Sequence, residues 1–236
     1  MPSDAALSIE ELTDIAGLEA WVHPDCLAIE SDQSPCEDND PIWKLWAALP
    51  LTSYLYENDA LHRPVYRTPG RNGHPYWQFD GTSQHFKWYN WFPTLAQGDY
   101  WFAGDFPLPE AEAYWLGRVD LSFCQSLQPG LTDKMGYYNA TEHWPIAPAV
   151  AGFHVYRFKC DRASELVTVY RDGILLGQGP YVDNADHTAP YLMSKQNANE
   201  HYGVGDLYEV AHWSQTLTDP EAAAVLVHLK AKYGIA

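Results

Sequence analysis

The chain has 236 residues, 46% of them hydrophobic, so it can bury a substantial core, and its formal net charge is −17. A charge of this sign and size repels phosphate backbones and anionic lipid headgroups, which argues against binding to nucleic acid or to a membrane surface. The 17 proline and 16 glycine residues are spread along the chain as turn residues, so we predict a single all-β domain over residues 1–236.

The N-terminal segment lacks the basic and long apolar runs of a secretory signal, and no stretch reaches the roughly 18 consecutive apolar residues of a membrane span. We therefore expect the protein to be made in a cytoplasm, where thiols stay reduced. The cysteines show no zinc-site spacing and are interpreted as buried free thiols: Cys26, Cys36, Cys124 and Cys160. Residues 1–16 are expected to form an arm or, over residues 9–14, a short helix.

The first two thirds of the chain predict strands separated by turn residues. Residues 18–22 have strand composition, and the acidic, proline-containing segment that follows, up to residue 49, is expected to be a long loop. Residues 42–46 in that segment fit either one helical turn or a strand. Residues 141–151 are expected to be a proline-rich loop. Strand composition recurs at residues 73–81, 84–92, 99–106, 114–123 and 132–138.

Residues 153–179 contain three apolar runs rich in β-branched and aromatic residues, broken at residues 161–164 and at Asp172-Gly173. An Asp-Gly pair between two such runs is typical of a hairpin, because a type I′ turn needs positive φ at both central residues. The pattern therefore predicts three antiparallel strands in a meander.

Residues 219–233 are predicted to form a helix. Thr218 and Glu221 make a capping box, Pro220 lies in the first turn, and Gly234 supplies the left-handed residue that ends a helix. Apolar residues recur along one side at helical spacing: Ala222, Val225, Leu226, Leu229 and Tyr233. We expect this apolar stripe to pack on a sheet.

Three segments carry recognisable motifs. Residues 73–81 end in a Phe-Asp-Gly strand and turn, residues 205–213 begin with Gly-Asp-Leu-Tyr-Glu-Val, and residues 229–235 read Leu-Lys-Ala-Lys-Tyr-Gly-Ile. These segments resemble a strand and turn, the last core strand and the frequent C-terminal ending of laminin G-like domains in the concanavalin A-like lectin/glucanase superfamily. The resemblance depends on the order in which these segments and the three-stranded meander follow one another along the chain. It implies a concanavalin A-like jelly-roll β-sandwich of two antiparallel sheets with a C-terminal helix.

The glucanases of this superfamily carry their catalytic carboxylates in a Glu-x-Asp-x-Glu or Glu-x-Asp-x-x-Glu motif, and this sequence contains neither. Asp206 and Glu209 are three residues apart, so on a regular strand they point to opposite faces and cannot act on one sugar. Motifs of serine hydrolases, zinc proteases and nucleotide-binding loops are also missing from the sequence. We therefore predict no catalytic residues and interpret Glu209 as a structural residue, hydrogen-bonded near a sheet edge.

Aromatic residues are in excess, at 14% of the chain. Sugars present apolar C–H faces that stack on aromatic rings, whereas Trp and Tyr also anchor protein interfaces and fill cores. For any one ring we rank core filling first, a protein interface second and glycan binding third. The candidates for a carbohydrate- or partner-binding surface are Trp88, Trp91, Tyr138 and Trp144.

Asp183, Asn184 and Asp186 cluster in one polar segment and are candidate ligands for Ca²⁺, although acidic loops are more often simply solvated. We predict no other cofactor.

Three functions are compatible with these features. The first function, which the resemblance implies, is that of a non-enzymatic structural or interaction protein of a tailed-phage virion, such as a head decoration or tail adhesin component. It would fold in the host cytoplasm and contact other virion proteins or copies of itself. The second is a carbohydrate-binding module that recognises a polysaccharide through surface aromatics. The third, without a recognisable catalytic motif, is a glycoside hydrolase.

Overall fold

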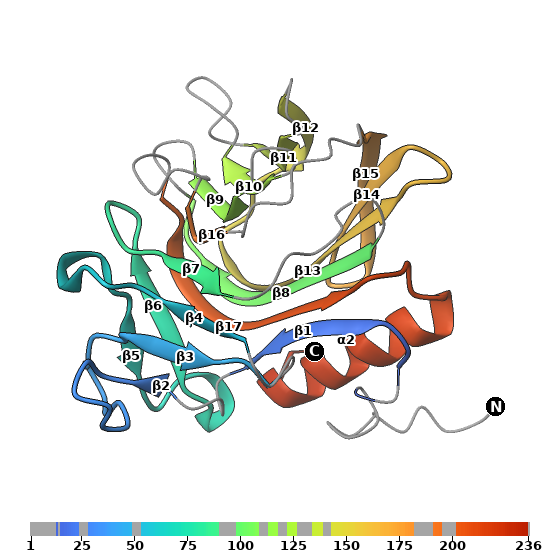
Figure 1. The fold of residues 1–236 in the computed structure, drawn as a ribbon. Helices are drawn as coiled ribbons and strands as arrows, with labels where there is room; N and C mark the ends of the chain where they lie inside the picture. The colour runs from blue at the N-terminus through green and yellow to red at the C-terminus, as the bar shows by residue number, and fades with distance from the viewer. Residues whose placement is uncertain are drawn as a thin grey trace.

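The computed structural model describes Thr13 and residues 15–23, 28–48, 53–89, 98–108, 113–117, 122–126, 134–138, 143–181, 191–194 and 202–235. Within these residues the chain forms two antiparallel sheets, with an α-helix on the outside of one of them (Figure 1). The predicted all-β sandwich with a C-terminal helix is therefore confirmed.

The first sheet, called sheet A below, contains the long, curved strands of the molecule (Figure 1). One further strand, β1 (Leu18–Val22), pairs with β17 beside the main path. In spatial order, the strands of the main path are β15 (Ile174–Pro180), β14 (Leu166–Arg171), β13 (Gly152–Asp161), β8 (Gly98–Phe106), β17 (Val204–Trp213), β6 (Tyr76–Asp80) and β5 (Val65–Arg67).

The second sheet, called sheet B, is built mainly from shorter strands. In spatial order these are β12 (His143–Pro148), β11 (Lys134–Tyr138), β10 (Ser122–Ser126), β9 (Ala113–Gly117), β16 (Tyr191–Leu192), β7 (Phe86–Tyr89), β4 (Tyr54–Tyr56), β3 (Lys44–Trp46) and β2 (Ala28–Ile29). Two short 3₁₀ turns, η1 (Ala60–His62) and η2 (Arg71–Gly73), lie in the connections on either side of β5.

Strand alternation gives sheet A two apolar faces. On β8, Tyr100 and Phe102 belong to the core between the two sheets, whereas Trp101 and Ala103 belong to a second core under the helix. Since successive side chains of a strand point to opposite faces, one continuous apolar run serves both cores. Sheet A is thus the middle layer of the molecule.

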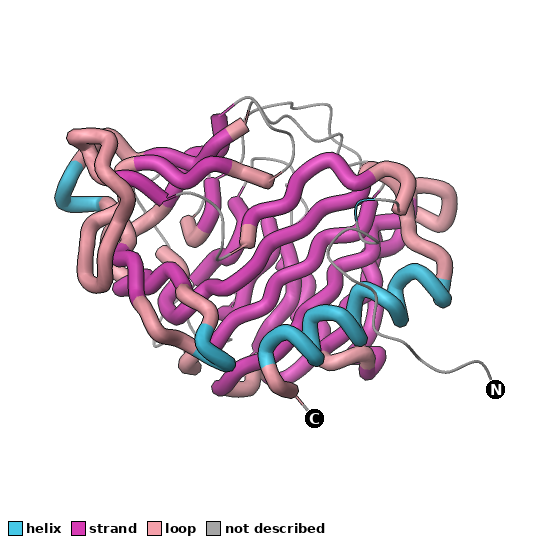
Figure 2. The backbone as a smooth tube through the Cα atoms, turned by 90° about the horizontal axis from the view of Figure 1, so that it is seen from below, coloured by secondary structure: helices cyan, strands magenta, loops and turns pink. Residues whose placement is uncertain are grey.

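The helix α2 (Asp219–Tyr233) lies across the outer face of sheet A (Figure 2). Its start and end follow the prediction: Thr218 and Glu221 form the capping box, and Gly234 adopts the left-handed conformation at φ 62°. The helix buries four apolar side chains of the predicted stripe, together with His228: Ala222, Val225, Leu229 and Tyr233. The predicted helix is therefore confirmed at both ends.

The predicted meander is also confirmed, as β13, β14 and β15. Asp172 and Gly173 connect the last two strands with φ values of 53° and 86°, as a type I′ turn requires. The strand predicted at residues 18–22 is β1, and the strand that ends in Phe79 and Asp80 is β6.

Several other predictions differ from the structure. The proline-rich segment 141–151 is not a loop throughout, because it contains β12, an edge strand that tolerates its prolines. The single strand expected at residues 114–123 is instead two strands, β9 and β10. The long loop expected before residue 49 contains β2 and β3, so residues 44–46 form a strand. Apart from Thr13, which is helical, the expected helix at residues 9–14 lies outside the described residues.

Candidate functional site

The four aromatic candidates do not come together in the described part of the structure. Trp88 is fully buried between the sheets, where its indole Nε1 donates to Ser53 Oγ at 2.6 Å, so it fills the core and cannot stack on a sugar. Trp144 is half-buried on β12 and packs against the same core. Tyr138 ends β11, but its side chain lies outside the described residues, as does all of Trp91.

The Ca²⁺ candidates Asp183, Asn184 and Asp186 also lie outside the described residues. Within the part of the chain that is described, no group of three or more His, Cys, Asp or Glu side chains could hold a metal ion. In the same part, no helix is long and apolar enough to cross a membrane.

A different set of aromatic residues gathers on the outer face of sheet B. Leu45, Leu55 and Trp88 are cross-strand neighbours on β3, β4 and β7, and all three point into the core. Their neighbours along each strand must therefore point outwards. We call these outward rings the aromatic face: Trp46, Tyr54, Tyr56 and Tyr89.

The rings of the aromatic face contact one another. Tyr54 and Tyr89 stack with their centroids 4.6 Å apart and their planes 18° apart. Trp46 lies 5.2 Å from Tyr54 on one side, and Tyr56 lies 5.7 Å from it on the other. Tyr89 remains 50% exposed, so the stacked pair presents ring surface to solvent.

A lysine holds one end of the aromatic face in place. The ammonium of Lys44 lies 3.7 Å from the centroid of Tyr54, 4.5 Å from that of Trp46 and 5.5 Å from that of Trp43. Cation–π attraction of this kind is worth about 0.5–2 kcal/mol per contact. Lys44 therefore restricts the rings before any ligand arrives, which lowers the entropy cost of binding.

A polar pocket of about 240 Å³ adjoins the aromatic face at Tyr56. Its walls combine aromatic, charged and amide groups: Tyr56, Glu57, Asn58, His62, His85, Lys87 and Tyr191. Lys87 has no carboxylate partner among the described residues, and its ammonium lies 5.9 Å from the ring of Tyr191. The pocket therefore offers hydrogen-bond donors and acceptors directly beside exposed rings.

A buried pair forms the floor of this pocket. His85 is 3% exposed, and its Nε2 lies 2.8 Å from Glu57 Oε2 while its Nδ1 lies 3.0 Å from the carbonyl oxygen of Ser83. Both ring nitrogens of His85 therefore have a partner within the protein. Burial acts to raise the pKa of Glu57, but the hydrogen bonds from His85 and from the backbone N–H of Asp59, together with the electrostatic attraction of His85 and His62, outweigh burial and hold the pKa below its usual value. Glu57 is thus already committed to a partner.

Sequence reasoning missed this site because it placed Trp46 and Tyr54 in or next to an expected loop. The signal that could have found it is the alternation Tyr54-Leu55-Tyr56, a short strand with two rings on one face.

The carboxylates considered for catalysis are arranged differently from the prediction. A β-bulge between Leu207 and Glu209 shifts the register of β17 against β8, so the strand is not regular there. Tyr208 and Glu209 both contact α2. Asp206 lies two residues before Tyr208 on the same strand, so its side chain points to the same face as that of Tyr208. The inference that Asp206 and Glu209 point to opposite faces is therefore wrong.

Glu209 nevertheless has a structural part. It is 2% exposed and accepts hydrogen bonds from Trp21 Nε1 at 2.6 Å, Lys232 Nζ at 2.8 Å and Tyr233 Oη at 2.6 Å. Burial acts to raise its pKa, but the charge and hydrogen bond of Lys232 outweigh burial and hold the pKa below its usual value. The predicted hydrogen bonding is confirmed, whereas the predicted place near a sheet edge is wrong, since β17 lies between β8 and both β6 and β1.

No protein family and no curated protein matches the sequence. Among solved structures, Trypanosoma rangeli sialidase in complex with 2,3-difluoro-KDN is similar at 12% identity and a TM-score of 0.55, over 92% of this chain and 33% of the sialidase chain. A mutant of that sialidase with trans-sialidase activity gives 12% identity and a TM-score of 0.58, over 92% and 34%. The chain thus spans about a third of the length of these proteins.

The CBM40 module of Ruminococcus gnavus IT-sialidase is also similar, at 14% identity and a TM-score of 0.42, over 56% of this chain and 84% of the module. At these identities the sialidase likeness concerns the fold alone. The class of protein, a β-sandwich, is defined by the two sheets and the helix themselves.

Proposed function

We propose that this protein is a non-catalytic carbohydrate-binding protein and that the aromatic face of sheet B is its binding surface. The observation that carries the proposal is the half-exposed ring of Tyr89, which stacks on Tyr54, itself flanked by Trp46 and Tyr56 and held by Lys44. An exposed ring supported in this way can stack on the apolar C–H face of a sugar unit. The polar pocket beside Tyr56 supplies partners for hydroxyl groups.

Three further aspects of the proposal have their own support. A laminin G-like or concanavalin A-like origin rests on the sequence resemblance, and jelly-roll sandwiches include lectin domains. The absence of catalysis is supported by Glu209, whose carboxylate already has three donors. A virion role rests on the sequence resemblance alone, and under it the aromatic face would be a contact between copies or with another virion protein.

A glycan array with the purified protein tests the proposal. We expect a defined set of glycans to bind the wild-type protein, at least about tenfold weaker binding by Tyr89→Ala, and unchanged binding by Ile174→Ala, an exposed apolar control on sheet A that is 69% exposed. Light scattering on the same sample separates the alternatives. A silent array with a symmetric oligomer that Tyr89→Ala dissociates would replace the proposal with an assembly interface.

A further inference from the structure

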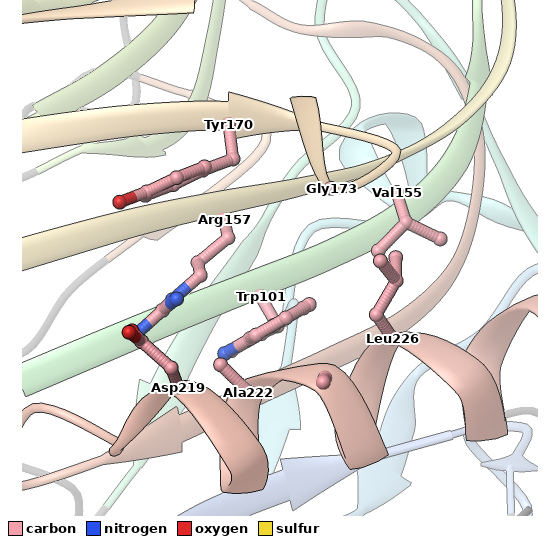
Figure 3. Close-up of a pocket in the computed structure, with 9 residues that line it drawn as sticks. Trp101, Val155, Arg157, Tyr170, Gly173, Asp219, Ala222 and Leu226 are labelled. Atoms are coloured by element: carbon pink, nitrogen blue, oxygen red, sulfur yellow. The ribbon is translucent and has the colours of Figure 1, made fainter. Parts of the chain in front are cut away.

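A second pocket, of about 220 Å³, lies on the opposite side of the molecule from the aromatic face, between sheet A and α2 (Figure 3). Its walls come from β8, β13, β14, the turn at Gly173 and the first two turns of the helix. The small side chains Ala222 and Ala223 leave the room between helix and sheet. At about 30 Å³ per water molecule, the volume equals about seven waters, the size range of a small organic molecule.

The sheet wall of this pocket is a row of three side chains on adjacent strands. Arg157 of β13 is the cross-strand neighbour of Trp101 on β8 and of Tyr170 on β14. Its guanidinium carbon lies 5.5 Å from the ring of Trp101 and 5.2 Å from that of Tyr170. The two rings therefore fix the position of the guanidinium.

Arg157 is only 7% exposed, and most of its donors are engaged. Asp99 accepts from Nε and Nη2, and the carbonyl oxygen of Leu217 also lies within hydrogen-bond reach of Nη2. Nη1 has no partner among the described residues, yet the side chain lines the pocket. A guanidinium N–H that is accessible from the pocket and has no protein partner among the described residues favours a ligand with a strong acceptor, such as a carboxylate.

Asp219 supplies the opposite charge. It is the first residue of α2 and lines the same pocket, but the capping box uses Thr218 and Glu221, so its carboxylate is not needed for the cap. Within the described residues it forms no ion pair with Arg157. The charge of Arg157 is already balanced by Asp99. A ligand that carries only a negative charge would therefore be repelled by Asp219. A ligand that carries only a positive charge would leave Nη1 of Arg157 without an acceptor.

The apolar part of the pocket lies away from both charged groups. Figure 3 shows Val155 and Leu226 on one side of the pocket, with Arg157 and Asp219 on the other. Val155 belongs to the buried core under the helix, and Leu226 packs against that core. This side therefore favours an aliphatic group.

We propose that this pocket binds a small zwitterion with an aliphatic side chain, that is, a free apolar α-amino acid. The carboxylate of the ligand accepts from Nη1 of Arg157, its ammonium donates to Asp219, and its side chain contacts Val155 and Leu226. In an α-amino acid the ammonium, the carboxylate and the side chain are all attached to the α-carbon. This arrangement matches a pocket in which two adjacent charged groups lie opposite an apolar wall. This site is separate from the aromatic face and does not depend on carbohydrate binding.

Four ligands that differ by one group each test the assignment by NMR titration of the wild-type protein. L-leucine is expected to bind saturably. 4-Methylpentanoate lacks the ammonium, isopentylamine lacks the carboxylate, and glycine lacks the side chain, so each is expected to bind at least about tenfold more weakly. Equal binding of 4-methylpentanoate and leucine, or of isopentylamine and leucine, would overturn the zwitterion, and so would the absence of saturable leucine binding.

Two variants locate the site without changing Arg157, whose buried ion pair supports the fold. Ala223→Leu, on the exposed side of α2, fills the pocket and is expected to abolish leucine binding. Asp219→Asn is expected to weaken the binding of leucine and isopentylamine about tenfold and to leave the binding of 4-methylpentanoate unchanged or tighter. Glu37→Gln, an exposed carboxylate far from the pocket, is the charge control and should bind as wild type. Leucine binding that survives Ala223→Leu would contradict the location.

Discussion

The two outer faces of the sandwich carry similar aromatic side chains in different surroundings. On sheet A, the outward-facing Trp101, Tyr208 and Trp213 are 3%, 5% and 0% exposed, because α2 and β1 cover or flank them. On sheet B, Tyr89 is 50% exposed, and no described element covers the aromatic face. The comparison teaches that the covering helix, rather than the ring itself, decides whether an aromatic residue stabilises the fold or remains available to a ligand.

The largest effect is expected where the helix is fastened to sheet A. Glu209→Ala leaves the ammonium of Lys232 buried without its partner and removes the acceptor of Trp21 and Tyr233. We expect a loss of about 3–5 kcal/mol in the free energy of unfolding, measured by urea denaturation. Glu37→Gln should change it by less than about 0.5 kcal/mol. A loss below about 1 kcal/mol for Glu209→Ala would mean that this cluster does not hold the helix.

A smaller effect is expected at the start of the same helix. Thr218→Ala removes the hydroxyl of the capping box, so Glu221 keeps only the hydrogen bond from the backbone N–H of residue 218. We expect the free energy of unfolding to fall by about 1 kcal/mol, which lowers the midpoint of thermal unfolding by about 2–4 °C. An unchanged midpoint would show that packing alone sets the start of α2.

On the aromatic face, a substitution should affect ligand binding strongly and stability only slightly. Tyr89→Ala removes a half-exposed ring whose main contact is Tyr54, so we expect a loss of stability below about 1 kcal/mol, together with the loss of glycan binding. Thermal unfolding and binding measured on one sample check both. A large loss of stability would assign Tyr89 to the fold and remove the contrast between the two faces.

A pH-dependent loss of stability is expected at the end of β6. Asp80 ends β6, and although burial acts to raise its pKa, the backbone N–H groups of Ser83, Thr82 and Gln84 outweigh burial and lower it to about 2. Since the pKa of the folded state lies below the unfolded value of 3.8, this stabilisation is present above about pH 4 and is lost as the pH falls towards 2. Unfolding measured at pH 5, 3.5 and 2.5 should show a stability gap between wild type and Asp80→Asn that narrows with falling pH. A gap independent of pH would contradict the assignment.

The sequence predicted the parts of the fold that are determined locally. The hairpin at Asp172 and Gly173 and the helix between Thr218 and Gly234 follow from φ preferences and capping hydrogen bonds among neighbouring residues. The apolar stripe of the helix was predictable for the same reason.

Sheet B and its aromatic face could not be predicted in the same way. β2, β3 and β4 have two or three residues each, too few for a clear period, and they are strands because distant segments pair with them. Whether Trp88 points inwards and Tyr89 outwards is decided by that register, which local composition does not specify. The bulge that places Asp206 and Glu209 on one face is likewise visible only in the pairing of β17 with β8.

The central claim is that the uncovered face of sheet B binds carbohydrate while the covered face of sheet A does not. The most direct test is isothermal titration of one glycan found by the array against the double variant Tyr54→Ala/Tyr89→Ala and against Ile174→Ala/Leu175→Ala, which removes two exposed apolar side chains from sheet A. We predict that the first variant folds but no longer binds, and that the second binds as wild type. Full glycan affinity in a folded Tyr54→Ala/Tyr89→Ala variant would contradict the account.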